Sequence, residues 1–135
     1  MQPQSFYRAV ADDFSAVDEI IKKQLDGLTY SVEGTGTKKG PDGKEMKVHH
    51  AYAMIRWSPE CKCYRFPSHT MMGSFADAEM RILGETVVWG FKTNLGEFRY
   101  TIRNNAKGQW HEVGERSMDG KTWTPFFEML LDRVR

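Results

Sequence analysis

The sequence WHEVGERSMDGKTWTPFFEM, from Trp110 to Met129, holds two tryptophans, three glutamates and a Met-Asp-Gly-Lys turn. Asp-Gly between two segments of alternating apolar and polar residues is a strong signal for a tight hairpin. Side chains alternate between the two faces of a strand, so Trp110, Glu112 and Gly114 share one face. We therefore expect the last hairpin of an antiparallel sheet, with an acid beside a tryptophan on its inner face.

The same period-two alternation begins at Leu28 and is broken at short intervals by glycine, proline and asparagine. Eight consecutive strands with short connections favour a meander, and a meander hides its edges by closing on itself. We predict a mainly β fold, a closed antiparallel meander barrel of about eight strands, with an open sandwich as the alternative. The predicted strands cover residues 28–36, 45–57, 61–67, 70–83, 86–93, 97–104, 108–117 and 123–134.

Residues 1–26 show a helical period instead. Charged residues separate apolar ones that recur at spacings of three and four, which predicts one N-terminal amphipathic helix. We expect this helix to cap the barrel of residues 27–135 as a plug or lid hinged at Asp26–Gly27, or else to pair with its twin in a dimer. The apolar positions are Phe6, Val10, Phe14, Val17, Ile20, Ile21 and Leu25.

The chain of 135 residues fits a single domain, and its net charge of +1 is spread along the sequence. This distribution argues against a nucleic-acid surface. The sequence shows neither a membrane span nor a leader, so we expect a cytoplasmic protein, monomeric or homodimeric. Cys61 and Cys63 are expected to be reduced thiols, with a soft-metal or redox role as the lesser alternative.

The aromatic side of each strand should face inward and form a ligand site. If Trp110 points inward then Glu112 does too, and a buried carboxylate is costly unless it is paired or protonated. Such an acid is either a polar handle for a ligand or a partner for a tyrosine, an arginine or a buried water. The candidate ligand-binding residues are Tyr52, Trp89, Phe91, Tyr100, Trp110, Glu112, Glu128 and His50.

No catalytic motif accompanies these residues. The sequence lacks a nucleophile elbow, a dinucleotide fingerprint and any histidine or cysteine spacing diagnostic of zinc, and residues 33–40 are predicted to form a hairpin tip rather than a phosphate site. We expect a protein that needs no cofactor or metal and binds a small, largely apolar ligand. The alternatives are a small isomerase or hydrolase that uses Glu112 or Glu128 as general acid or base, and a structural module with a filled core.

The C-terminal segments Glu97 to Ile102, Trp110 to Glu115 and Ser117 to Val134 resemble a bacterial family of lipocalin-like barrels whose function has not been settled. The resemblance covers mainly the last forty residues. It implies a calycin-type fold with a central cavity. Related barrels carry fatty acids, retinoids or haem, and a few are isomerases, so the resemblance strengthens the expected barrel more than any one function.

Overall fold

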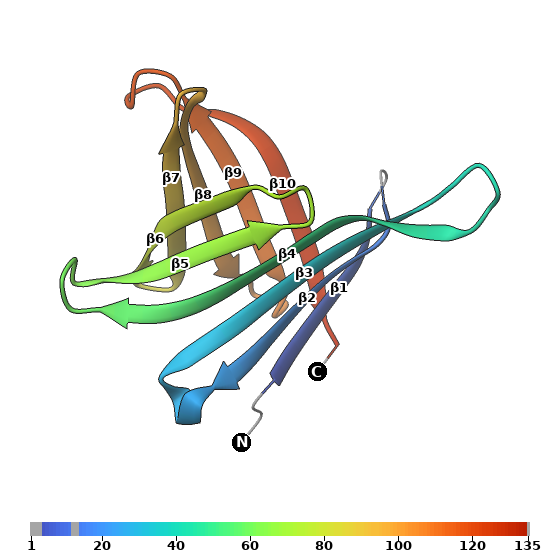
Figure 1. Cartoon of the computed structure of the whole chain (residues 1–135), viewed down its shortest axis with the longest axis horizontal. Helices are drawn as coiled ribbons and strands as arrows, with labels where there is room; N and C mark the ends of the chain where they lie inside the picture. The colour runs from blue at the N-terminus through green and yellow to red at the C-terminus, as the bar shows by residue number, and fades with distance from the viewer. Residues whose placement is uncertain (1–3, 12–13, 135) are drawn as a thin grey trace.

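A computed structural model describes residues 4–11 and 14–134 of the chain. Within them ten antiparallel strands follow one another around a closed barrel, and each strand pairs with its neighbours in sequence (Figure 1). The predicted antiparallel meander is therefore confirmed, whereas the expected number of strands was too low. The strands are β1 (Gln4–Ala11), β2 (Phe14–Gln24), β3 (Thr29–Lys39), β4 (Glu45–Ser58), β5 (Cys63–Thr70), β6 (Phe75–Leu83), β7 (Thr86–Thr93), β8 (Gly96–Asn104), β9 (Trp110–Ser117) and β10 (Thr124–Arg133).

The predicted N-terminal helix was wrong. The hairpin of β1 and β2 occupies most of residues 1–26, while Asp12 and Asp13 lie outside the described residues. A single 3-10 turn, η1 (Leu25–Gly27), connects β2 to β3 at the position expected to be a hinge. No helix in the described part of the chain is long and apolar enough to cross a membrane. The predictions of a helical plug and of a dimer formed by this helix are therefore also wrong.

An acid that points into the barrel explains why the strand pattern of β2 was hidden. Glu19 lies opposite Gly34, and Ile21 opposite Val32, in the pairing of β2 with β3. Alternation then places Val17, Glu19 and Ile21 on one face, which is the inner one. An acidic residue at an inward position breaks the apolar alternation of a strand, and the remaining apolar residues recur at helical spacings.

The barrel closes through a short pairing of β1 with β10. In its register Tyr7 is the strand partner of Arg133, and Arg8 is that of Asp132. Two buried clusters fill the inner side: Val32 packs against both, so they form one continuous core. One cluster comes from β4 to β6, and the other joins β1 to β9 and β10. Their buried members are Ala53, Phe66, Ala78 and Met80 in the first, and Tyr7, Trp110 and Leu131 in the second.

The structure also corrects the state of the two cysteines, which form a disulfide rather than free thiols. The predicted strand 61–67 begins only at Cys63, so Cys61 belongs to the preceding turn. Lys62 between them has a positive φ of 51°. This left-handed residue bends the chain and brings the two Cα atoms to 5.2 Å, well inside the usual range for a disulfide.

Gly90 on β7 provides a test of how closely β7 and β8 approach each other. A Cβ added there would collide with the backbone carbonyl oxygen of Phe98 on β8. Gly90→Ala is expected to lower the free energy of unfolding by about 1 to 3 kcal/mol, because a backbone clash is not relieved by rotating a side chain. Urea denaturation followed by tryptophan fluorescence measures the loss.

Lys92→Ala, on the same face of β7 and exposed, is the matched control and should change the stability by less than about 0.5 kcal/mol. Equal stabilities for the two variants would contradict the close approach of β7 and β8 at this point.

Candidate functional site

Glu112 is at the centre of the candidate site. β9 carries it on the inner face between Trp110 and Gly114, where its exposed fraction is 6%. The indole Nε1 of Trp110 donates a hydrogen bond of 3.0 Å to Oε1 of Glu112. Trp110 is itself buried and meets the Tyr7 ring edge-on, with the ring centroids 5.2 Å apart. The buried Trp110 indole thus holds the Glu112 carboxyl in place.

Two stacked rings form the wall beside this carboxyl. Trp89 of β7 and Tyr100 of β8 face each other across the strand pair, with centroids 4.1 Å apart and planes at 9°. Phe91 stacks against Trp89 at 6.1 Å. The Tyr100 ring approaches Gly114 so closely that a Cβ there would lie 2.9 Å from it. The absence of a side chain at Gly114 therefore allows the flat wall to reach β9.

A second acid, Glu19, was not among the predicted site residues. β2 directs it into the barrel opposite Gly34, where a Cβ would lie 2.7 Å from Oε1 of Glu19. Gly34 thus leaves the space that the carboxyl occupies. The signal in the sequence was an acid flanked by Val17 and Ile21 at strand spacing, which helical periodicity concealed.

Burial sets the electrostatics of the two acids. Desolvation, and then the negative charges of Glu112 and Asp18, raise the pKa of Glu19 to about 8. Desolvation raises the pKa of Glu112 to about 7, opposed by hydrogen bonds from the indoles of Trp110 and Trp89. Burial, then the charge of Glu112, raises the pKa of the Tyr100 hydroxyl. Near neutral pH the site therefore holds protons that ordinary carboxyls would have lost.

The inner wall is not sealed by side chains. Glu19 is desolvated enough to shift its pKa strongly, yet the residue as a whole is only partly buried. Trp89, Phe91 and Tyr100 are also only partly buried. Water therefore reaches parts of the aromatic wall and of Glu19.

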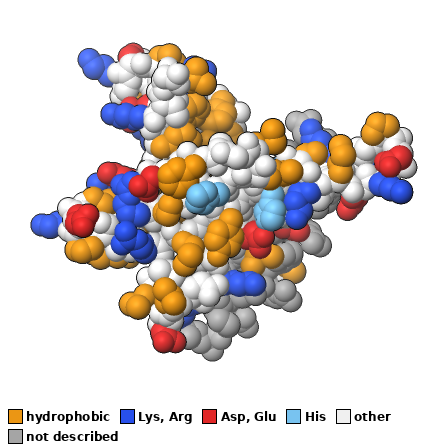
Figure 2. Space-filling view, viewed as in Figure 1, with side chains coloured by type: hydrophobic (Ala, Val, Ile, Leu, Met, Phe, Trp, Pro, Cys, Tyr) orange, Lys and Arg blue, Asp and Glu red, His pale blue; other side chains and the backbone are white. Residues whose placement is uncertain are grey.

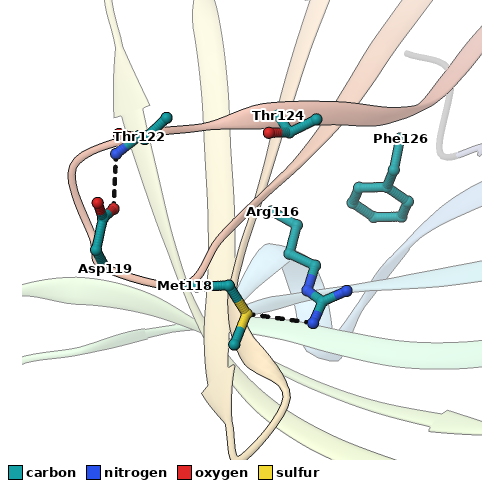
Figure 3. Close-up of a pocket in the computed structure, with 6 residues that line it drawn as sticks. All are labelled: Arg116, Met118, Asp119, Thr122, Thr124 and Phe126. Carbon is teal, nitrogen blue, oxygen red and sulfur yellow. Dashed lines mark hydrogen bonds between the residues drawn. The ribbon is translucent and has the colours of Figure 1, made fainter.

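A pocket of about 480 Å³ opens next to this wall, where β9 ends and β10 begins (Figure 3). Arg116 continues the inner face of β9 into the pocket, and its Nε donates to the carbonyl of Leu95 at 2.9 Å. Phe126 lies at a bulge in β10 and meets Tyr100 edge-on at 6.0 Å. Phe126 thus belongs both to the pocket and to the aromatic wall. The lining residues are Arg116, Met118, Asp119, Thr122, Thr124 and Phe126.

Asp119 at the rim of this pocket stabilises the turn. Its carboxylate accepts the backbone N–H groups of Lys121 and Thr122, each at 2.8 Å, and the Ser117 hydroxyl at 3.1 Å. These bonds hold its pKa at about 2. The Asp119 carboxylate therefore stabilises the Met-Asp-Gly-Lys turn that the sequence predicts.

Three predicted site residues lie apart from the inner wall. The side chain of Glu128 is 71% exposed, and an oxygen of its carboxyl lies 2.9 Å from Nε2 of His111. His50 meets Glu33 at 2.6 Å, and Tyr52, on the same strand face, is 43% exposed. Histidine side chains lie at the surface of the face shown in Figure 2.

The misplacement has a physical cause. On β4 and β10 both strand faces are largely apolar, so alternation alone does not identify the inner one. In β10 the inward set contains the fully buried Leu131 rather than Glu128. Among the residues that the structure describes, no three histidine, cysteine or acidic side chains are grouped to hold a metal ion.

Comparison with known protein families and with curated proteins finds no match to this chain.

The two acids predict how stability depends on pH. Unfolded, both titrate near 4.5, so up to about 7 for Glu112 and about 8 for Glu19 the folded chain binds more protons than the unfolded one. The free energy of unfolding should therefore fall as pH rises from about 5 to 8. Glu19→Gln should flatten this fall and raise stability at pH 8 by at least about 1 kcal/mol.

Urea denaturation across this pH range measures the effect, and Glu128→Gln, on the outer face, is the matched control. The same pH slope in the wild type and in Glu19→Gln would show that Glu19 is not desolvated.

Proposed function

We propose that the chain is a small-molecule binding protein whose ligand contacts the inner wall of the barrel at Trp89, Tyr100, Trp110 and Glu112. The observation that carries the proposal is the Glu112 carboxyl, buried among aromatic rings and fixed by the Trp110 indole. Phe91 extends the same wall, and Glu19 adds a second polar group. A largely apolar surface with a few fixed polar groups is the usual composition of a ligand site.

Energetics favour this reading over a structural module with a filled core. Desolvation raises the pKa of both carboxyls, the charge of Glu112 adds to the shift of Glu19, and both shifts lower the stability of the folded chain at neutral pH. Apolar residues of similar volume would fill the same space without that cost. A group that destabilises the fold but is held in place by a hydrogen bond is best explained by contact with a ligand.

The chemistry of the wall defines the ligand class. A flat or narrow apolar body suits the stacked Trp89 and Tyr100 rings, and a hydrogen-bonding group on the ligand would meet Glu112. The pocket at Phe126 and Arg116 is the proposed entrance, because Phe126 also touches Tyr100. This ligand is small and apolar or lipid-like.

The proposal includes membership of a bacterial lipocalin-like family and a cytoplasmic location. The closed antiparallel meander supports the first, together with the resemblance in segments from Glu97 to Val134. Fold likeness alone does not define a ligand, so the proposal rests on the site.

Native mass spectrometry of the freshly purified chain tests the binding proposal. The wild type should carry a reproducible excess mass over the denatured chain, and Glu112→Gln should reduce the loaded fraction about tenfold by removing a charge-assisted hydrogen bond. Glu128→Gln is the matched control and should keep the excess mass. A wild-type chain that travels alone, and whose interior binds no xenon by nuclear magnetic resonance, would contradict the proposal.

The near-neutral pKa of Glu112 favours a second candidate, a cofactor-free enzyme in which Glu112 takes up and returns a proton. Nitrobenzisoxazole is a suitable probe, because a carboxylate removes its ring proton and the N–O bond opens to a coloured cyano-nitrophenolate. The rate should rise as pH increases through about 7 and fall to background in Glu112→Gln. A rate unchanged in that variant would remove Glu112 as the base.

A further inference from the structure

The disulfide at the β4–β5 turn joins two sulfurs of very different access. Cys63, the first residue of β5, is 2% exposed and belongs to the buried interior. Cys61, in the turn before it, is partly exposed. A molecule arriving from solvent therefore meets the sulfur of Cys61, while that of Cys63 is shielded behind it.

The disulfide adds little to the stability of the hairpin. It encloses a single residue, Lys62, and the stabilisation from closing a loop in the unfolded chain grows with loop length. The strands are already held in register, with Ser58 opposite Cys63 and Trp57 opposite Tyr64. The rings of Trp57 and Tyr64 also meet edge-on at 5.1 Å. A structural role does not account for the bond.

The charged residues around the accessible sulfur are three cations and two acids. Cys61 lines a pocket of about 380 Å³ with the basic residues Arg56 and Arg65 and the acidic residues Glu60 and Asp77. The exposed Lys62 follows Cys61 in the chain and leaves a small excess of positive charge. Arg65 is fixed at the pocket by Asp77, which lies 2.9 Å from its guanidinium. Cations near a cysteine favour its thiolate form, which is both the nucleophile and the better leaving group in disulfide exchange.

We propose that Cys61 and Cys63 form a thiol–disulfide exchange site that accepts low-molecular-weight thiols through this pocket. A substrate thiolate attacks Sγ of Cys61, the bond between the two cysteines breaks, and Cys63 leaves as a thiolate. A second substrate thiolate then attacks the substrate sulfur of the mixed disulfide, which releases the oxidised substrate and the Cys61 thiolate. Two thiols lose two electrons in all, and the cysteine pair gains them.

This activity is independent of the ligand proposed for the barrel. The cysteines lie at the β4–β5 turn, whereas the inner wall with Glu112 is built from β7 to β9. Each proposal can therefore fail without the other.

Glutathione serves as the probe. Wild-type protein equilibrated in buffers of reduced and oxidised glutathione should interconvert reversibly between disulfide and dithiol, as read by alkylation and intact mass, while circular dichroism shows unchanged strand content. A disulfide that yields to glutathione only after the barrel is unfolded, or native thiols that oxidised glutathione never converts to the disulfide, would overturn the proposal.

Single-cysteine variants test the order of attack. Cys63→Ala retains the accessible sulfur and should form a mixed disulfide with oxidised glutathione at least about tenfold faster than Cys61→Ala, which retains the buried one. Equal rates in two folded variants would overturn the assignment of Cys61 as the attacked sulfur. The wild-type equilibrium decides the proposal even where a variant fails to fold.

Discussion

The packing of Tyr7 against Trp110 connects the closure of the barrel to the candidate site. Tyr7 is buried on β1, faces Arg133 across the seam with β10 and faces Glu19 on β2. Its ring also meets Trp110, which donates to Glu112. The residue that closes the sheet is thus in contact with the tryptophan that fixes the acid, and barrel closure brings Glu19 and Glu112 within electrostatic reach of each other.

β9 organises the inner wall by its period of two. Trp110 supplies the donor at the base, Glu112 the acid, Gly114 the space for the Tyr100 ring, and Arg116 the charge at the pocket. Each of these residue types performs a different task at equal spacing along one strand face. The polarity of the wall therefore changes in a fixed order, from a buried acid to a cation at the opening.

The sequence predicted the C-terminal half of the fold well because its strands are clearly two-sided. On β8 the aromatic side chains of Phe98 and Tyr100 alternate with Arg99 and Thr101, and glycine turns separate the strands. Alternation also indicated that Trp110 and Glu112 share a face. The N-terminal hairpin was missed because an acid occupies an inward position on β2.

Other misplacements arose where one strand offers no contrast between its faces. On β4 and β10 apolar residues lie on both sides, so Tyr52, His50 and Glu128 were assigned inward while the structure exposes Tyr52 and Glu128 and pairs His50 with Glu33. The disulfide depends on a left-handed backbone at Lys62, a non-glycine residue whose conformation no local pattern announces. Tertiary contacts decided these positions.

The seam between the first and last strands has a consequence for folding kinetics. β1 and β10 are more than a hundred positions apart in the chain, so their pairing carries the largest loop-closure entropy of any contact in the sheet. The other strand pairs join sequence neighbours and form through local hairpins. We therefore expect the strands to form an open, curved sheet first. The pairing of its two edge strands, β1 and β10, should come last and be the slow step.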